Sequence, residues 1–481
     1  MIRAILSLAA LLLAAFFIAA AQPAERTACS TASPSPDGSR IFPVAEGQMS
    51  CVLTDSKGIR WRYQGDTLFN EYGSGWIAFT RNSELQINDR GKAFLATFCQ
   101  GNLTGKFWTL RDGTLAISPT HPLADSFVDR TEGTSYNNLG QMLQSGRVRD
   151  GDHLEVKPLP PGLAIYRTAS RITQSGITLD IDAGARIGCV QDEGNSIIPF
   201  DTSGGPIKRV TIEGKGGLGE IAYLHDLSGG SFRCINIGKA TDITLKSLYI
   251  HDCDMGLIAG GHNGTTTLSG VIFDHNGSGY SAAATHNMYL SIGCLEQGCD
   301  TSVAQLTDVR SYCTNAGGFE LKSRYPSGTW TGIVAAEPSP HGMSGCHESA
   351  AMDFSCGGRY TVGAKGRGKG FVAEIGPGFE LNDGAVIRWN MDPPSVCPRG
   401  GWSSQTAIFQ NCWIINDSHA TRVTALVKRG EANVTVKDCK IVGNGTKIAL
   451  GDGIRDGGGN VFYASRSNAR LPPYPALPPV P

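Results

Sequence analysis

The chain has 481 residues, a formal net charge of −1, and 18% of its residues are charged. Proteins that bind nucleic acids in general carry a basic excess, so this composition argues against that class. The 62 glycines follow no collagen period and are expected in tight turns between short strands. The 14 cysteines suit an oxidising compartment. The chain contains no CxxC pair of the kind that forms a zinc ribbon.

The first 21 residues have the pattern of a secretory signal peptide. Arg3 gives a short positive region, residues 4–18 are apolar apart from Ser7, and three alanines precede Gln22 as a small-residue cleavage site. No later run approaches the roughly 18 apolar residues of a membrane-spanning helix. We therefore expect no membrane span and a secreted or periplasmic mature protein.

The next segments are expected to be a linker and a small β domain. Residues 22–40 are rich in serine and proline, as linkers are. Residues 41–118 place short aromatic strands around Gly-Asp and Gly-Ser turns, as in "IRWRYQGDTLFNEYGSGWIAF". This pattern resembles the small aromatic-rich β modules that accompany carbohydrate-active domains. A purely structural cap is the other interpretation.

From residue 125 to residue 465, short strands and glycine turns recur. A short amphipathic helix in "NLGQMLQSGRVRDGDHLEV" is expected to lead into the first strand. Strand–turn units then begin at residues 243, 267, 305, 405 and 434. Spacings of roughly 23–39 residues, with loops inserted in some units, predict one structural unit per repeat. Each unit ends in a polar or cysteine corner: Cys253, Asn276, Asn315, Cys412 and Cys439.

This repeat predicts an all-β fold, in which a right-handed parallel β-helix, a single-stranded solenoid, follows the small β domain. Stacked coils would place equivalent residues in ladders, where a corner asparagine can bond to the coils above and below. The repeats resemble the pectate-lyase-like superfold, and "LQSGRVRDGDHLEV" resembles the opening segment of its bacterial members. Residues 466–481, which end in "RLPPYPALPPVP", are expected to be a flexible proline-rich tail.

The stacking also predicts a disulfide. Cys412 and Cys439 occupy equivalent positions on successive repeats, so the coils would bring them within bonding range. The rest of the pairing cannot be read from the sequence. Two further pairs are close enough in sequence to clip loops: Cys294 with Cys299, and Cys346 with Cys356.

The stretches "THNMYL" and "GFELKSRY" are strands of successive repeats, and their apolar positions set a register. Met288 then lies over Leu321, and Met352 follows in the next coil, all in the core. Alternation along a strand also places His286 inward, over Phe319. The remaining side chains would form a polar outer groove, with neighbouring coils about 4.8 Å apart: Asn287, Tyr289, Glu320, Lys322, Arg324 and Asp353.

These residue types suit a polysaccharide lyase. Elimination across a uronic acid needs a cation to neutralise the carboxylate, a base for the C5 proton and an acid for the leaving oxygen. Arg324 is the expected cation, Lys322 the base and Tyr289 the acid, and Asn287 would hydrogen-bond the carboxylate. The expected partner is therefore an acidic polysaccharide.

Three further residues complete the predicted site as substrate-binding groups: Glu320, Asp353 and His286. A Ca²⁺ ion held by the two carboxylates is the alternative to an arginine as the neutralising charge. The sequence shows no other ligand set for a metal, because His341 and His347 lack a ligand spacing. It gives no indication of the oligomeric state.

The outward lysine and arginine on a β-helix resemble those of the alginate lyase and chondroitinase B family. The resemblance covers the fold and the residue types, and it implies a lyase acting on a uronic-acid polymer. The series "HNMYL", "FELKSR" and "MDFSCGG" resembles uncharacterised bacterial β-helix repeat proteins in which "HNxY" and "LKSR" recur.

Two other classes remain open. A glycoside hydrolase of the polygalacturonase type needs clustered carboxylates, and the chain has no "NTD", "GDD" or "GHG" stretch. Its "DCD" stretch gives two acids, Asp252 and Asp254, which strand alternation points the same way near a corner. A non-catalytic glycan-binding or structural β-helix is the third class. Lys322 and Arg324 would then lie on a solvated face, in ion pairs of little worth.

Overall fold

A computed structural model describes most of residues 143–471, and only the strands between residues 27 and 136. The predicted signal peptide, most of the predicted linker and the proline-rich residues 472–481 lie outside the described residues. So does most of the short helix expected before residue 150. Within 143–471 the structure leaves out residues 144–145, 158–165, 169–171, 191–195, 200–206, 223–232, 239, 252, 254, 260–263, 277–285, 291–300, 315–317, 337–347, 367, 377–384, 394–395, 398–401, 403, 419–422 and 446–447.

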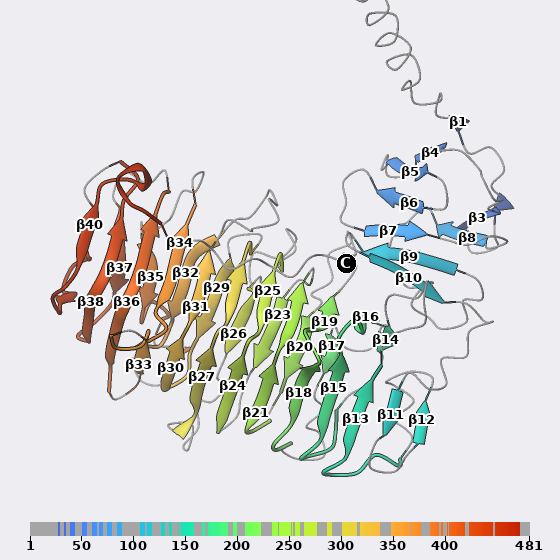
Figure 1. Ribbon diagram of the computed structural model, residues 1–481, viewed down its shortest axis with the longest axis horizontal. Coiled ribbons are helices and arrows are strands. Elements are labelled where there is room, and N and C mark those ends of the chain that lie inside the picture. Colours follow the sequence, from blue (N-terminus) through green and yellow to red (C-terminus); the bar gives the residue numbers. More distant parts are fainter. Residues whose placement is uncertain are drawn as a thin grey trace, which may run out of the picture.

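The N-terminal strands, blue to cyan in Figure 1, form two sheets of their own. These strands precede the solenoid in the chain, and β1 and β2 lie within the segment predicted as a linker. The first sheet, antiparallel apart from its edge strand β1, contains β1 (Thr27–Ala28), β4 (Cys51–Thr54), β5 (Arg60–Gln64), β6 (Thr67–Asn70), β7 (Gly75–Ala78), β9 (Lys106–Leu110) and β10 (Gly113–Ile117). The second contains β2 (Ser33–Pro34), β3 (Ser39–Pro43) and β8 (Glu84–Asn88).

The rest of the chain is a parallel β-helix, as the repeats predict, and its strands stack side by side along the molecule (Figure 1). Before the first coil, β11 (Phe127–Asp129) pairs antiparallel with β12 (Thr134–Tyr136) and with β13. The coils then build three parallel ladders. The first ladder contains β13 (His153–Val156), β15 (Thr178–Asp182), β18 (Thr211–Lys215), β21 (Ile243–Lys246), β24 (Thr265–Ser269), β27 (Val303–Thr307), β30 (Ser327–Thr331) and β33 (Arg359–Val362).

The second ladder lies beside the first in a sheet of 22 strands. It contains β14 (Tyr166–Thr168), β16 (Arg186–Val190), β19 (Gly219–Ala222), β22 (Leu248–His251), β25 (Ile272–Asp274), β28 (Arg310–Tyr312), β31 (Ile333–Ala336) and β34 (Phe371–Ile375). The long strands β36 (Thr406–Asn416) and β38 (Asn433–Val442) continue both ladders. The last strands are β39 (Arg455–Asp456) and β40 (Val461–Tyr463), and a 3₁₀ turn, η3 (Arg466–Asn468), follows.

The third ladder is a separate sheet of eight strands. It contains β17 (Ser196–Pro199), β20 (Arg233–Ile237), β23 (Met255–Ala259), β26 (Met288–Leu290), β29 (Gly318–Ser323), β32 (Glu348–Phe354), β35 (Ala385–Trp389) and β37 (Thr424–Lys428).

At the corner between the first and second ladders, successive coils place a residue with a left-handed backbone conformation. Ser247, Asp308 and Asn411 have φ values of 51°, 55° and 54°, and Gly270 has a φ of 64° at the same point of its coil. Glycine, asparagine and aspartate tolerate this conformation best. The backbone N–H of Ser247 donates to the carbonyl of Ser269 in the next coil at 2.8 Å. Each corner therefore turns the chain and bonds it to its neighbour.

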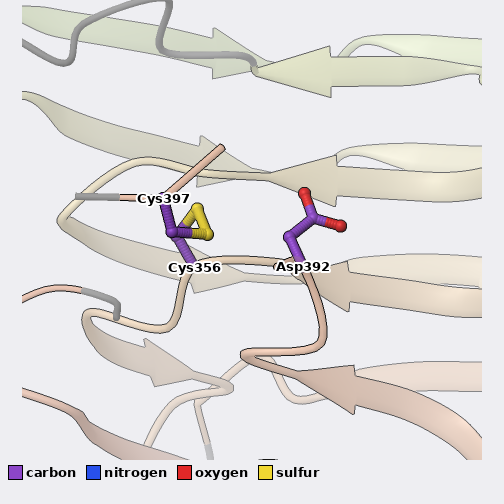
Figure 2. A group of neighbouring side chains, drawn as sticks. All are labelled: Cys356, Asp392 and Cys397. Carbon is purple, nitrogen blue, oxygen red and sulfur yellow. A yellow bond between two sulfur atoms is a disulfide. The ribbon is translucent and has the colours of Figure 1, made fainter. Parts of the chain in front are cut away.

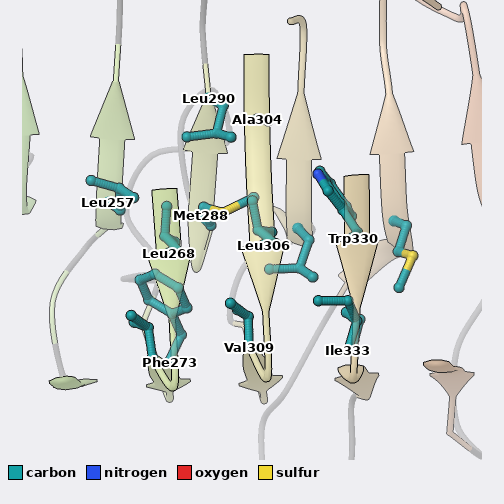
Figure 3. Packing of buried hydrophobic residues seen from close by; sticks show 14 of the residues in the cluster. Leu257, Leu268, Phe273, Met288, Leu290, Ala304, Leu306, Val309, Trp330 and Ile333 are labelled. Carbon is teal, nitrogen blue, oxygen red and sulfur yellow. The ribbon is translucent and has the colours of Figure 1, made fainter. Parts of the chain in front are cut away.

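The core follows the register expected from the sequence. Met288 pairs with Leu321, and Leu321 pairs with Met352. All three side chains are fully buried. Figure 3 shows Met288 of the third ladder pointing into the same core as Leu306 and Trp330 of the first.

The disulfides fit the oxidising compartment suggested by the cysteine content. Cys412 and Cys439 are bonded, with their Cα atoms 4.4 Å apart, which confirms that prediction. Cys356 is bonded to Cys397, so the alternative pairing with Cys346 is wrong. A third bridge joins Cys234 to Cys253. Cys294 and Cys299 lie outside the described residues. Within the part of the chain that the structure describes, we found no helix with the length and apolarity to cross a membrane.

Candidate functional site

In the third ladder, the chain bends near the N-terminal ends of β26 and β29. This bend determines which side chains point to the outer side of the ladder. Asn287 is fully buried directly before the core residue Met288, and Glu320 is fully buried directly before Leu321. The pairing of β29 with β32 is irregular between Gly318 and Phe319. Two consecutive side chains of each strand therefore point inward, and strict alternation fails on the N-terminal side of the bend.

Asn287 and Glu320 consequently belong to an interior polar cluster, which we define as Asn276, Asn287, Ser311, Thr314 and Glu320. The Asn287 amide donates to the Glu320 carboxylate and to the Tyr312 carbonyl at 2.9 Å, and its oxygen accepts from Asn276 Nδ2 at 2.8 Å. Glu320 also accepts from Ser311 Oγ at 2.6 Å and from the Thr314 N–H at 2.7 Å. The prediction that Asn287 and Glu320 line an outer groove is wrong, because these bonds tie the second ladder to the third.

The other half of the predicted groove does lie on the outer side of the third ladder. Tyr289 pairs with Lys322, Lys322 pairs with Asp353, and Asp353 pairs with Arg388. One row across four coils thus carries an aromatic, a cation, an anion and a second cation. With four neighbouring side chains this row forms the outer patch: His286, Tyr289, Phe319, Lys322, Arg324, Asp353, Arg388 and Asp392.

His286 lies in this outer patch and not in the core, because it precedes the bend. Its ring meets the Tyr289 ring edge-on at 5.2 Å between centroids, and it lies 5.1 Å from the ring of Phe319. Its Nδ1 accepts a hydrogen bond of 3.0 Å from the Phe319 N–H. In the neutral imidazole the proton is therefore on Nε2.

Lys322 is at the centre of the outer patch and is 7% exposed. Its Nζ lies 3.4 Å from Asp353 Oδ2 and 3.8 Å from Asp392 Oδ1. The same nitrogen lies over two aromatic rings, 5.1 Å from the centroid of Tyr289 and 4.9 Å from that of Phe319. Partly desolvated cation–π contacts of this kind add about 1–2 kcal/mol and fix the position of the ammonium group.

Two arginines flank this lysine. Arg324 Nε donates to Asp392 Oδ2 at 2.7 Å, and its guanidinium carbon lies 5.2 Å from the centroid of the Tyr289 ring. The guanidinium carbon of Arg388 lies 5.2 Å from the centroid of Phe319. Both arginines are partly exposed. Three cations against two carboxylates leave the outer patch with a positive excess, which favours an anionic ligand.

Asp353 is the most buried acid of the outer patch, at 1% exposure. Burial raises the pKa of its carboxyl, while Lys322 and Arg388 act to lower it. Its Oδ2 accepts from Ser355 Oγ at 2.6 Å. Its Oδ1 is buried without a hydrogen-bond partner among the described residues. An unmatched buried acceptor of this kind is costly in a purely structural role.

The predicted calcium pair does not form. Glu320 is bonded inside the coil, whereas Asp353 is on the outer patch, so their carboxylates are not brought to one ion. Figure 2 shows another compact group, Cys356, Asp392 and Cys397. Its two sulfur atoms form the disulfide and are not thiolates, so the group does not resemble a metal site. Asp392 instead pairs with Arg324 and Lys322.

Sequence reasoning missed Arg388, Asp392 and Phe319. Arg388 could have been predicted from the sequence. When Ile387 is placed over Met352, "AVIRWN" aligns with "AAMDFS" and Arg388 falls beside Asp353. Strict alternation predicts Phe319 in the core, whereas its ring lies beside Lys322 and His286 on the outer patch. Asp392 follows β35 in a loop, and no spacing connects it to Arg324, 68 residues earlier.

A separate groove of about 490 Å³ lies on the first ladder. Its lining includes Thr329, Arg359, Thr361, Ile408 and Thr435. None of the predicted site residues lies there.

Searches against models of known protein families, curated proteins and solved structures found no match to this chain.

Proposed function

We propose that the protein is a secreted polysaccharide lyase that cleaves a uronic-acid polymer by β-elimination at the outer patch. The observation that carries the proposal is Lys322, which lies between the Tyr289 ring and the Asp353 carboxylate with an arginine on either side. The three disulfide bonds among the described residues fit export to an oxidising compartment.

The two arginines would neutralise the uronate carboxylate. Arg324 and Arg388 are partly exposed and can each offer a planar pair of donors to a carboxylate. This makes the C5 proton next to the carboxylate more acidic. The sequence predicted Arg324 as the neutralising cation, and this assignment adds Arg388.

Lys322 would be the base and Tyr289 the acid. The Asp353 carboxylate lies 3.4 Å from Lys322 Nζ and would hold this nitrogen in place. Lys322 Nζ takes the C5 proton, and the electron pair of that C–H bond forms the C4=C5 double bond. The bond from C4 to the glycosidic oxygen breaks, and Tyr289 donates its proton to that oxygen. Tyr289 is then recharged from solvent.

A non-catalytic glycan-binding protein is the alternative. It is favoured by the internal ion pairs of the outer patch, which already compensate Lys322 and Arg324. A glycoside hydrolase is supported less, because both acids of the outer patch, Asp353 and Asp392, contact cations.

A screen against uronate polymers distinguishes these classes. Elimination gives an ultraviolet-absorbing double bond and a new reducing end, hydrolysis gives only the reducing end, and binding gives neither. We expect at least one polymer to yield the absorbing product with the wild type and not with Lys322→Ala. Polymer retention without either product would assign the outer patch to binding.

A further inference from the structure

In the structure, Asp392 occupies the donors of Arg324 that the proposed function assigns to the substrate. Arg324 Nε donates to Asp392 Oδ2 at 2.7 Å, and Arg324 Nη2 pairs with the same oxygen. One edge of the guanidinium group is therefore already bonded to a carboxylate. A uronate carboxylate has the same charge and the same planar shape, so it would compete for these donors.

A ligand can reach this ion pair from solvent. The side chains of Arg324 and Asp392 are 18% and 16% exposed. Asp353, the other acid of the outer patch, has a side chain that is only 1% exposed. An incoming carboxylate can therefore exchange with Asp392 at Arg324, whereas Asp353 is covered. Because one carboxylate replaces another, the charge of Arg324 stays compensated during the exchange.

The backbone of Asp392 is anchored, so only its side chain has to move in this exchange. The backbone N–H of Asp392 donates to the Ser355 carbonyl at 3.1 Å. Cys397, five residues later, is bonded to Cys356, which follows Ser355 (Figure 2). Rotation about the side-chain bonds can turn the carboxylate away from Arg324 while both anchors stay in place. The same rotation returns it when the ligand leaves.

The displaced carboxylate would keep a cationic partner. Asp392 Oδ1 already lies 3.8 Å from Lys322 Nζ, and rotation of the side chain can shorten this contact. Arg324 also has a second contact, because its guanidinium carbon lies 5.2 Å from the centroid of the Tyr289 ring. This cation–π contact would hold the guanidinium group in position for the ligand after Asp392 has left.

We propose that Asp392 is an internal competitor for the substrate carboxylate, and that a bound uronate displaces it from Arg324. The free protein holds Arg324 in a compensated pair, and ligand binding exchanges one carboxylate for another. Asp392 thus lowers the affinity of the outer patch for carboxylates and excludes anions that cannot break the pair. The inference rests on the proposed uronate contact with Arg324, and it does not depend on the elimination step.

The affinity for uronate polymers tests the competition, with polygalacturonate, alginate and hyaluronan as probes. Every protein compared carries Tyr289→Phe, so that bound polymer is not cleaved. Asp392→Asn keeps the size of the side chain and removes its charge, and it should bind about tenfold more tightly because the competing ion pair is lost. The matched control is Asp308→Asn, which removes the same charge from an exposed ion pair with Lys369 and should leave the affinity unchanged. Asparagine tolerates the left-handed backbone conformation of residue 308.

The sign of the change distinguishes two roles of Asp392. Unchanged binding in Asp392→Asn would overturn the proposal, and weaker binding would overturn it by making Asp392 a positioning residue for Arg324.

A crystal structure of Asp392→Asn grown in acetate keeps the test decisive if no polymer binds. Acetate is expected on Arg324 Nε and Nη2 in this variant, and not in wild-type crystals grown in the same way. An Arg324 without acetate in the variant would overturn the proposal. Failure of the proposed function gives a different result, in which the elimination product is absent although the variant still gains carboxylate binding.

Discussion

The interior polar cluster and the outer patch are built from the same two strands, yet their polar groups are satisfied in different ways. Asn287 and Glu320 point inward, and two residues later Tyr289 and Lys322 point outward. Inside, both oxygens of Glu320 accept hydrogen bonds from the protein. Outside, Asp353 Oδ1 has no hydrogen-bond partner among the described residues.

This difference separates a structural role from a functional one. A buried network that is fully bonded stabilises one arrangement of the chain. The outer patch has a positive excess, partly exposed arginines and an acid whose pKa is raised by burial. Perturbed acids beside cations are typical of reactive sites. Substitutions in the two regions should therefore change different quantities.

The largest effect is expected on catalysis from the outer patch. Lys322→Ala and Tyr289→Phe should each lower kcat by roughly 10²–10⁴-fold, the usual contribution of a general acid or base. Turnover of the most reactive uronate polymer measures it, with circular dichroism as the check on folding. Lys246→Ala, which removes an exposed ion pair with Glu213 on the first ladder, is the control and should leave kcat unchanged. Full turnover in both variants would place the chemistry elsewhere.

The interior cluster should respond in stability. Glu320→Ala leaves the donors of Asn287, Ser311 and Thr314 without their acceptor. We expect the free energy of unfolding to fall by about 2–4 kcal/mol. Urea unfolding measures the loss, and the folded variant should keep its kcat. A variant as stable as the wild type that has lost turnover would make Glu320 a catalytic residue and reverse the comparison.

A smaller effect is expected from Arg388, which the structure adds to the site. Arg388→Ala should raise KM for a uronate polymer about tenfold, since one charge-assisted contact to the carboxylate is worth about 1.5 kcal/mol. The same variant should bind a neutral polymer no differently from the wild type. An unchanged KM would restrict carboxylate binding to Arg324.

The smallest effect concerns pH and Asp353. The folded pKa of Asp353 is raised by burial, so its contribution to stability is present below the unfolded pKa of about 3.9 and is lost as pH rises through the folded value. The Asp353→Asn variant has no titratable group at this position and is the reference for the comparison. The stability of the wild type relative to the variant should therefore decline as pH rises from about 4. Urea unfolding at several pH values gives the slope, and a constant difference would show that the pKa is not raised.

The sequence predicted the solenoid and the core register because both follow from periodic apolar residues. Met288, Leu321 and Met352 repeat at the same point of three coils, and any slip would bury the charges of Lys322 and Asp353 in the core. The bend at Asn287 was not predictable from alternation, since it depends on how the third ladder turns from the second. The pairing of Asp392 with Arg324 joins a loop to a strand two coils away, and no local pattern encodes it.

The most direct test of the account is a crystal structure of Lys322→Ala with a uronate oligosaccharide bound. We expect a uronate carboxylate between Arg324 and Arg388, with the glycosidic oxygen within hydrogen-bonding distance of the Tyr289 hydroxyl. The account would be contradicted by an oligosaccharide held in the threonine-lined groove of the first ladder, with the outer patch empty.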